Sequence, residues 1–548
     1  MSWKDDYLWW QRGIIYQVYP RSFQDASGDG CGDLEGIRRR LDYLEWLGVD
    51  AVWISPFFPS PMKDFGYDIA DYTDVDAIFG QMHDFDRLLE DAHGRGLRVI
   101  LDLVPNHTSD QHPWFVESAL SKESPKRDWY IWSDPGPDGG PPNNWVSEFA
   151  GSAWEFHEPT GQYYYHAFLA EQPDLNWRND AVCEAMFDVM RFWLDKDVDG
   201  FRVDVMWHMI KDEHMRNNPP NPDYRPGEES PYDEYLPVYS ADQPEVHDVV
   251  VGMRQVMDEY DERVMIGELY LPIDQLVTYY GEEESEAHLP FNFQLVGAPW
   301  DAAHIRSIVD RYEASLPEDG WPNWVLGNHD QSRIATRIGR AQARLAAMLL
   351  MTLRGTPTMY YGDELGMVDV DIAPDQVVDP RELRSPGMGL GRDPERTPMQ
   401  WSADANAGFT DAEPWLPVAP DFETCNVERE RDEPDSTLSL YRRLISLRRS
   451  EPALAVGDYW PVDAKPPLFG YVRCFEDEAF LVVLNFRGEP QTFRPDSRFA
   501  GAEVVVSTVE SDPQGRVVDG ELELAADEGV IARLPHAPAE HPASTIEP

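Results

Sequence analysis

The chain has 548 residues, of which 42% are hydrophobic and 12% aromatic, so it can bury a large core and is not disordered over most of its length. It carries 100 acidic and 46 basic residues, and its net charge of −54 repels nucleic-acid phosphates and anionic lipid, which excludes both as partners. No stretch reaches the roughly 20 apolar residues that span a bilayer, and the acidic N-terminus does not resemble a secretory signal. We therefore expect a cytoplasmic protein without a membrane partner.

The excess of acid is the strongest compositional feature. Only seven of the 46 basic residues are lysine, and the acids are scattered rather than gathered in a tail. An ordinary acidic protein and a protein with a basic partner are the alternatives. We favour adaptation to high salt, because at ~1 M salt the Debye length is ~3 Å and surface self-repulsion nearly vanishes.

The four cysteines, Cys31, Cys183, Cys425 and Cys474, lie far apart and form no Cys-x-x-Cys pair. We expect neither a disulfide framework nor a zinc site, in keeping with a reducing compartment.

Apolar runs rich in Val, Ile, Tyr and Trp alternate with amphipathic stretches along most of the chain. Strands are predicted at 14–20, 51–56, 97–104, 200–205, 264–269, 288–293, 324–326 and 357–361. Helices are predicted at 34–48, 85–92, 182–194, 246–260, 305–316, 342–353 and 438–447. Because each return to a parallel strand needs a crossover, eight strands alternating with helices predict an α/β fold, the TIM (β/α)8 barrel.

Three long segments interrupt this alternation after predicted strands, where barrel active sites lie. Residues 108–176 are rich in Pro, Gly, Asn and Trp and predict a small inserted domain B after the third strand, whereas 216–244 and 366–426 are long excursions.

The alternating pattern ends before the last hundred residues. We assign 1–107 and 177–455 to the barrel and 456–548, with its short β-type runs, to a C-terminal antiparallel β domain. Residues 535–548 are rich in Pro, Ala and Glu and are expected to be disordered.

Three carboxylates, Asp204, Glu268 and Asp330, stand at or just beyond predicted strand ends. Arg202 shares a strand face with Asp204, and a neighbouring guanidinium lowers a carboxyl pKa, which keeps a nucleophile ionised. Glu268 ends an apolar run whose burial should raise its pKa, as suits a general acid. Because adjacent strands lie about 4.8 Å apart, these two carboxyls can approach the ~5–5.5 Å separation of retaining glycosidases. Helix caps and structural ion pairs are the alternatives.

Two histidines, His107 and His329, each follow an asparagine after a β run. Neutral imidazoles beside a carboxylate suit hydrogen bonding to sugar hydroxyls, and packed core histidines are the alternative. No set of His, Cys and Glu has zinc spacing, which disfavours metal-assisted hydrolysis.

Together these segments resemble the alpha-amylase superfamily of glycoside hydrolases. Its four ordered motifs are matched by DLVPNH at 102–107, GFRVD at 200–204, GE at 267–268 and NHD at 328–330. Three further segments are similar to its oligo-1,6-glucosidase and alpha-glucosidase branch: DFGYD at 64–68, QPDLN at 172–176 and GRDPERTPMQW at 391–401. The resemblance covers nearly the whole chain and implies the same barrel, inserted domain B and C-terminal β domain.

The resemblance also implies roles for individual residues. Asp204 would be the nucleophile, Glu268 the acid/base and Asp330 the stabiliser of the transition state. The residues implied around the terminal glucose are Asp64, Tyr67, His107, Phe149, Arg202, His329 and Arg396.

The loop 25–33 has oxygen-bearing residues at alternate positions, a pattern typical of hard-cation sites. It resembles the calcium loop of the family, in which Asp25, Ser27, Asp29, Asp33 and the Cys31 carbonyl would be the ligands. Ser27 stands where an Asn is usual and Cys31 where an aliphatic residue is usual. Magnesium and a plain turn remain alternatives, and no organic cofactor is expected.

The function that these features predict is a retaining, exo-acting α-glucosidase. It would release terminal glucose from short oligosaccharides or glucosides through a covalent glucosyl-enzyme, as a monomer or weak homo-oligomer. Val205 after the nucleophile resembles α-1,6-capable enzymes. A transglucosylase and a trehalose- or sucrose-active enzyme are the alternatives within the family. A catalytically silent binding protein, like the barrel subunits of amino-acid transporters, is disfavoured because all three acids are present.

Overall fold

The computed structural model describes residues 3–513 and 515–538, and the predicted tail beyond 538 lies outside this range. Eight parallel strands form the central sheet in the order β10-β11-β1-β2-β3-β7-β8-β9. They are β1 (Ile15–Val18), β2 (Ala51–Ile54), β3 (Arg98–Leu103), β7 (Gly200–Val203), β8 (Val264–Gly267), β9 (Leu289–Pro290), β10 (Asn323–Val325) and β11 (Thr356–Tyr360). A parallel bridge between Asn292 and Trp324 joins the two remaining edges, so the sheet closes into the predicted barrel.

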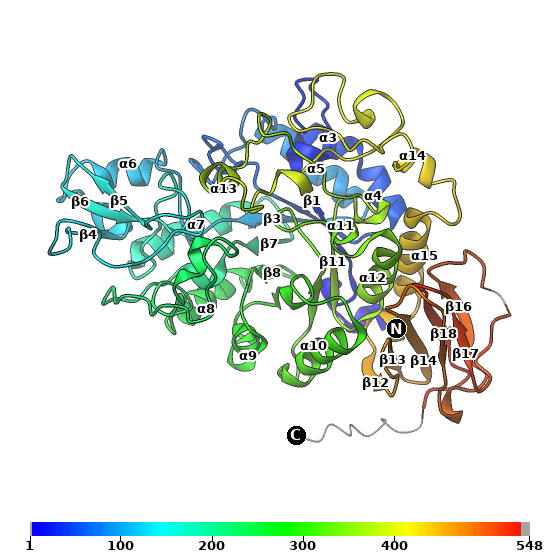
Figure 1. Cartoon of the computed structure of the whole chain (residues 1–548). Helices are drawn as coiled ribbons and strands as arrows, with labels where there is room; N and C mark the ends of the chain where they lie inside the picture. The colour runs from blue at the N-terminus through cyan, green and yellow to red at the C-terminus, as the bar shows by residue number, and fades with distance from the viewer. Residues whose placement is uncertain (1–2, 514, 539–548) are drawn as a thin grey trace.

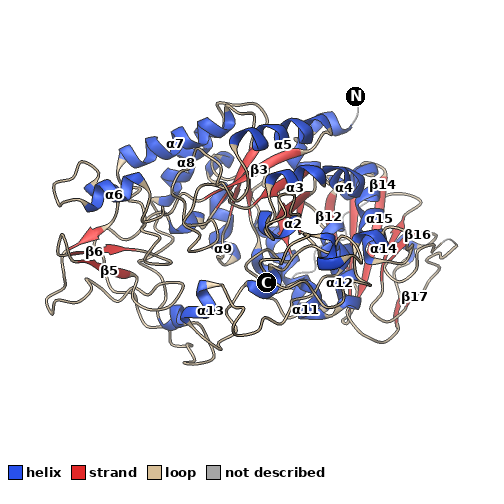
Figure 2. Cartoon of the chain, turned by 90° about the horizontal axis from the view of Figure 1, so that it is seen from above, coloured by secondary structure: helices blue, strands red, loops and turns tan. Residues whose placement is uncertain are grey.

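Helices surround the barrel strands, as Figures 1 and 2 show. The helices outside the inserted segment are α1 (Trp9–Arg12), α2 (Pro20–Phe23), α3 (Leu34–Arg39), α4 (Leu41–Leu47), α5 (Met82–Gly94), α7 (Asp180–Leu194), α8 (Val246–Met257), α9 (Ile273–Leu276), α10 (Ala302–Ser315), α11 (Ile334–Ile338), α12 (Arg340–Thr352), α13 (Pro380–Arg384), α14 (Val427–Glu430), α15 (Thr437–Ser450) and α16 (Pro452–Ala455). The longer ones bury an apolar stripe against the strands, as Val182, Met186 and Trp193 do in α7.

The single helix predicted at 34–48 is wrong in one respect, because it is divided into α3 and α4 at Arg40. The Arg40 guanidinium is held by the Gln24 side chain at 2.7 Å and stacks over Trp401, 4.0 Å from the ring centroid. Arg40 itself has φ −105° and ψ 6°, outside the helical range. The second helix ends as predicted at Gly48, which adopts φ 98°.

A small antiparallel sheet is inserted between β3 and α7. Its strands are β4 (Trp132–Ser133), β6 (Gln162–Tyr165) and β5 (Trp154–His157), in that spatial order, and α6 (Pro113–Ala119) precedes them. Trp145, Trp154 and Tyr165 form a separate aromatic core for this segment. A bridge between His107 and Asp174 returns the chain to the carboxyl end of the barrel, which fixes the inserted sheet beside the mouth.

The C-terminal region is an antiparallel sheet, as predicted. The order is β12 (Asp458–Val462), β13 (Leu468–Phe475), β14 (Glu478–Asn485), β18 (Gly529–Arg533) and β16 (Glu503–Ser507), and β15 (Gln491–Phe493) pairs with β17 (Leu522–Leu524). It lies on the opposite side of the molecule from the inserted sheet (Figures 1 and 2). The exact domain boundaries stay predictions. None of the helices in the described ranges combines the length and apolar character that a bilayer span needs.

Candidate active site

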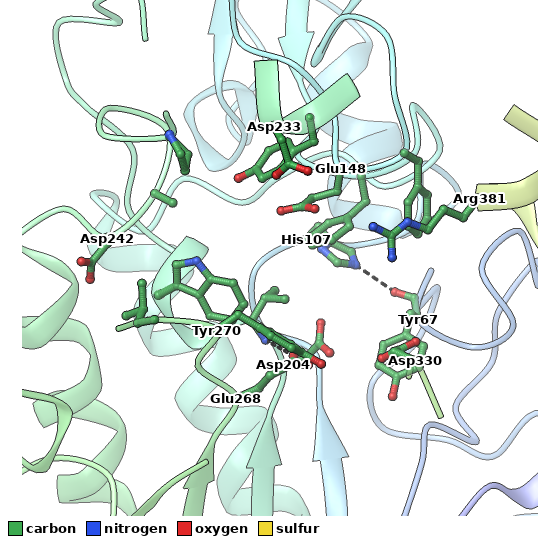
Figure 3. Close-up of a pocket in the computed structure, with 18 of the residues that line it drawn as sticks. Tyr67, His107, Glu148, Asp204, Asp233, Asp242, Glu268, Tyr270, Asp330 and Arg381 are labelled. Atoms are coloured by element: carbon green, nitrogen blue, oxygen red, sulfur yellow. Dashed lines mark hydrogen bonds between the residues drawn. The ribbon is translucent and has the colours of Figure 1, made fainter. Parts of the chain in front are cut away.

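A cavity of about 710 Å³ opens at the carboxyl ends of the barrel strands (Figure 3). Asp204 follows β7 directly, Glu268 follows β8 directly, and Asp330 lies five residues beyond β10. Seven of the ten predicted site residues line the cavity: Asp64, Tyr67, His107, Phe149, Asp204, Glu268 and Asp330. The other three, Arg202, His329 and Arg396, are fully buried behind the lining and contact it.

One guanidinium joins three carboxylates beneath the cavity. Arg202 Nη1 donates to Asp102 Oδ1 at 2.9 Å and to Asp204 Oδ1 at 2.6 Å, and Nη2 forms an ion pair with Glu268 Oε1 at 2.7 Å. The Val205 backbone N–H donates to Glu268 Oε2 at 2.8 Å, so the Glu268 carboxyl lies against the residue that follows Asp204. Asp204 and Glu268 are therefore neighbours that share one cation.

The turn after β7 brings about this arrangement. Val205 adopts φ 36° and ψ 48°, a left-handed conformation that is strained for a β-branched residue. The turn aims the Val205 amide at Glu268 while Asp204 keeps its place at the strand end. Such strain persists where the surrounding structure enforces it, and strained residues gather at functional sites.

The pKa values of this pair follow burial more than the neighbouring cation. Burial raises the pKa of Glu268 although Arg202 lowers it, which confirms the expectation for a general acid. Burial and the Glu268 charge also raise the pKa of Asp204 well above its usual range. The expectation that Arg202 gives Asp204 a lowered pKa is therefore wrong, because burial and the Glu268 charge outweigh one guanidinium that three carboxylates share. Asp204 and Glu268 therefore titrate as a pair, and the pair keeps one proton at pH values at which an ordinary carboxyl has lost its own.

Asp330 has the opposite electrostatic environment. Burial alone would raise its pKa, but His329, Arg396 and Arg392 lower it well below the usual range. The two guanidiniums carry this effect, because burial keeps His329 neutral by lowering its pKa. Arg396 Nη2 donates to Asp330 Oδ1 at 2.6 Å and Arg396 Nε to the His329 carbonyl at 2.7 Å. Arg396 thus positions an ionised Asp330 from behind rather than facing the cavity.

A chain of hydrogen bonds connects the second histidine with the floor of the site. The Gln17 amide nitrogen can only donate, so His329 Nδ1 accepts at 2.8 Å and the ring carries its proton on Nε2. His329 Nε2 then donates to the Tyr67 hydroxyl at 2.7 Å, and this hydroxyl donates to Asp102 Oδ2 at 3.0 Å. His329 acts on the site through Tyr67 and Asp102.

His107 is held by Tyr67 and by the preceding residue, Asn106. Its Nε2 donates to the Tyr67 carbonyl at 3.0 Å, and its Nδ1 accepts from the Asn106 amide at 3.2 Å. Burial lowers the pKa of His107, so the ring is neutral. The Lys211 ammonium donates to Asn106 Oδ1 at 2.7 Å, which explains why an asparagine precedes this histidine.

Arg392 is a site residue outside the predicted set, although it lies in the motif at 391–401. Arg392 Nη2 donates to Asp64 Oδ1 and to Asp379 Oδ1, both at 2.7 Å, and Nη1 donates to Asp330 Oδ1 at 3.1 Å. Its guanidinium carbon lies 5.0 Å from the centroid of the Phe149 ring. Arg392 therefore closes the side of the cavity formed by Asp64, Phe149 and Asp330, and the motif itself was the available signal.

The residues that form the roof of the cavity were not predicted individually. The roof comes from the predicted excursions and the inserted domain, which contribute Glu148, Tyr232, Asp233, Leu236, Pro237, Val238 and Arg381. Burial raises the pKa of Glu148 to about 7, and Arg381 and Tyr232 lower it. Figure 3 shows Glu148, Asp233 and Arg381 across the cavity from Asp204 and Glu268.

The acidic side chains of loop 25–33 are engaged with the loop's own N–H groups. Asp25 accepts from Gly28 at 2.7 Å and Gly30 at 2.8 Å, and Asp33 accepts from Ser27 at 2.9 Å. Within residues 3–513 and 515–538, no three His, Cys, Asp or Glu side chains form a group that could hold a metal ion. The oxygen donors are of the kind that calcium prefers, but here they close the turn. The calcium expectation stays a prediction.

Comparisons with known proteins agree with the motifs. The model of the alpha amylase catalytic domain matches residues 17–457. The chain is 40% identical over 532 residues to an oligo-1,6-glucosidase of Heyndrickxia coagulans, covering 90% of this chain and 94% of that protein. It is 41% identical over 498 residues to a probable alpha-glucosidase of Rhizobium meliloti, covering 88% and 90%.

Solved structures extend the same likeness. An alpha-glucosyl transfer enzyme, XgtA, superimposes with a TM-score of 0.92 at 40% identity, over 96% of this chain and 100% of that one. A trehalulose synthase superimposes with a TM-score of 0.88 at 36% identity, over the same shares of the two chains.

Proposed function

Because the chain belongs to the alpha-amylase family and is a glycoside hydrolase of the α-glucosidase and oligo-1,6-glucosidase type, we propose that it is a retaining, exo-acting α-glucosidase. It removes terminal non-reducing α-linked glucose from short oligosaccharides or glucosides. The observation that carries this proposal is the pairing of Asp204 and Glu268 on one guanidinium, with the ionised Asp330 facing the same cavity.

In the first step, a carboxylate oxygen of Asp204 forms a bond to the anomeric carbon while the bond to the aglycone oxygen breaks. Glu268 gives its proton to that oxygen. Asp204 loses negative charge as the ester forms, and Glu268 gains it as the proton leaves. Arg202 contacts the carboxyls of Asp204 and Glu268 at 2.6 and 2.7 Å. The negative charge therefore passes from one carboxyl to the other while both stay paired with the same guanidinium. In the second step Glu268 takes a proton from water, whose oxygen displaces Asp204.

Asp330 supports the transition state in both steps. Positive charge develops on the sugar as the bond to the leaving oxygen breaks. Arg392 and Arg396 hold the pKa of Asp330 low, so a negative charge is in place before the reaction begins. A preformed charge of this kind needs no reorganisation during the reaction.

Exo-action is supported by the wall that Arg392 forms. The pair of Arg392 and Asp64 joins the wall of Tyr67 and His107 on one side of the acids. Figure 3 shows Tyr270 on the other side of the acids from Tyr67. Tyr270 is 39% exposed, and Leu236 and Val238 of the roof are 40% and 50% exposed. We infer that glucose occupies the closed side and the aglycone the exposed side.

Transfer to a hydroxyl other than water is the second candidate. The similar structure XgtA is described as an alpha-glucosyl transfer enzyme, and the exposed apolar side chains at the mouth offer an acceptor a surface that water does not use. The products formed from maltose, isomaltose, sucrose and trehalose discriminate hydrolysis, transfer and sucrose isomerisation.

The test is the variant Asp204→Asn with p-nitrophenyl α-glucoside. We expect turnover to fall by about 10⁴-fold or more, as for other catalytic nucleophiles, whereas the exposed Asp519→Asn in the C-terminal domain leaves it unchanged. NMR of the wild-type reaction should show α-glucose as the first anomer released. Retained turnover in Asp204→Asn refutes the nucleophile, and β-glucose as the first anomer refutes retention.

A further inference from the structure

A second hollow, of about 740 Å³, lies away from the active site, where the barrel meets the C-terminal sheet. It is formed by Trp46 of α4, by α15 and the segment before it, and by Val505 of β16. Figures 1 and 2 both show α14, α15 and β16 close together at this end of the molecule. None of the residues that line it belongs to the lining of the active-site cavity.

Three arginines, Arg431, Arg442 and Arg443, line this hollow without an acidic partner. Within the described part of the chain none of them forms an ion pair, although Asp432 lines the same hollow. Asp435 raises the pKa of Arg443 less than burial lowers it. Three cations without an ion pair thus line one hollow in a chain that has 100 acidic and 46 basic residues.

Aromatic stacking and a backbone hydrogen bond fix the positions of the three guanidiniums but leave some of their N–H groups without an acceptor. Arg431 and Arg442 lie over the Trp46 ring, with 4.3 and 4.2 Å between the guanidinium carbon and the ring centroid. Stacking occupies the face of a guanidinium and leaves its in-plane N–H donors for an acceptor. Arg443 Nη1 donates to the Pro434 carbonyl at 2.7 Å, but its Nη2 is buried and has no partner among the described residues.

We propose that this hollow binds a phosphate group, either free or carried on a small molecule. A phosphate presents oxygens that match the planar N–H forks of arginine, and charge-assisted hydrogen bonds of this kind are the strong ones. Trp46 fixes two of the forks in advance, which lowers the entropic cost of binding. The volume exceeds that of a phosphate alone and falls in the range of small-molecule sites. Because the hollow spans α15 and β16, the bound ligand stabilises the joint between barrel and C-terminal sheet.

The experiment uses the full chain, with calorimetry and thermal unfolding in inorganic phosphate, glycerol 3-phosphate and, at matched ionic strength, chloride. We expect both phosphates to raise Tm beyond chloride, and Arg442→Gln to weaken phosphate binding at least tenfold with unchanged hydrolysis of p-nitrophenyl α-glucoside. Arg429→Gln is the matched control, because Arg429 is on the same segment but pairs with Glu433 at 2.8 Å. Arg431→Gln, on an exposed loop, repeats the test should Arg442→Gln unfold.

Tighter binding of glycerol 3-phosphate than of phosphate identifies a carried phosphate, and equal binding identifies the free ion. The proposal is overturned if chloride stabilises as well as phosphate does, or if the two lining variants bind phosphate as tightly as the wild type.

Discussion

Replacing Arg202 with methionine removes a buried cation and leaves its three carboxylates in place. Arg202 is 0% exposed and lies 2.9, 2.6 and 2.7 Å from the oxygens of Asp102, Asp204 and Glu268. Methionine fills much of the same space without a charge, so packing changes little. Removal of one partner from a buried ion pair costs about 3–5 kcal/mol. Because three carboxylates lose their partner here, we expect a loss near the upper end of that range at neutral pH.

The loss of stability in Arg202→Met should depend on pH. Burial already raises the pKa values of Asp204 and Glu268, and that of Asp102 to about 6. Loss of Arg202 raises all three further, so between the ordinary carboxyl pKa of about 4 and the raised values the folded state binds more protons than the unfolded state. Stability then falls as pH rises through this window. The destabilisation should be small near pH 4 and larger at pH 7.5.

Denaturant unfolding at pH 4.5 and pH 7.5 measures the effect. Arg494→Met is the matched control, because Arg494 and Glu521 pair at 2.9 Å with 66% and 57% of their side chains exposed, and such a pair contributes less than about 1 kcal/mol. Adding Asp204→Asn to Arg202→Met should restore part of the stability at pH 7.5, since one unpartnered charge is gone. A loss that is equal at both pH values, or below about 1 kcal/mol at pH 7.5, would refute the shared-cation account.

Four further outcomes are expected. Arg392→Ala should lower kcat/KM on maltose by about 10²–10³-fold, because Asp64 and Asp330 lose their common donor; an unchanged value contradicts the closed wall. Glu148, with a pKa of about 7 raised by burial, is protonated below that pH and charged above it, so KM for disaccharides should change across pH 6–8 in the wild type and stay level in Glu148→Gln. Thermal unfolding should shift upward from 0.1 to 2 M KCl because of the −54 charge, and a level Tm removes the proposal of salt adaptation. Chelation should lower Tm and calcium restore it if loop 25–33 holds the ion; no response to either leaves a plain turn.

The barrel could be predicted because its strands are buried on both faces and stand out as apolar runs. The strand predicted at 288–293 is shorter in the described structure, where it covers only Leu289–Pro290. Proline has no N–H to donate, and the remaining closure is the bridge from Asn292 to Trp324. The shortening of this strand depends on how the last strands of the barrel meet, which the local hydrophobic pattern of the sequence does not indicate.

The convergence of Asp204, Glu268 and Asp330 could be predicted because the carboxyl ends of barrel strands meet on one face, whatever the conformation of the loops. Arg392 and the roof residues come from segments without periodicity, and their convergence depends on the folding of three separate excursions. The pKa of Asp204 was predicted wrongly for a related reason. A neighbour two residues away is visible in the sequence, whereas Asp102 and Glu268, which share the same guanidinium, arrive from other strands.

Electrostatic interactions in the buried site differ from those at the surface in their response to salt. Outside, the −54 charge is balanced by ions in solution, and at the high salt that we propose the Debye length of ~3 Å removes most of its repulsion. Inside, Arg202 and Arg396 face their carboxylates at 2.6 to 2.9 Å and are 0% exposed, so salt does not screen them. Added surface acid therefore leaves the balance of charge inside the site unchanged. Arg431, Arg442 and Arg443 of the second hollow are neither part of the acidic surface excess nor paired with buried carboxylates. They therefore indicate an anion that comes from outside the chain.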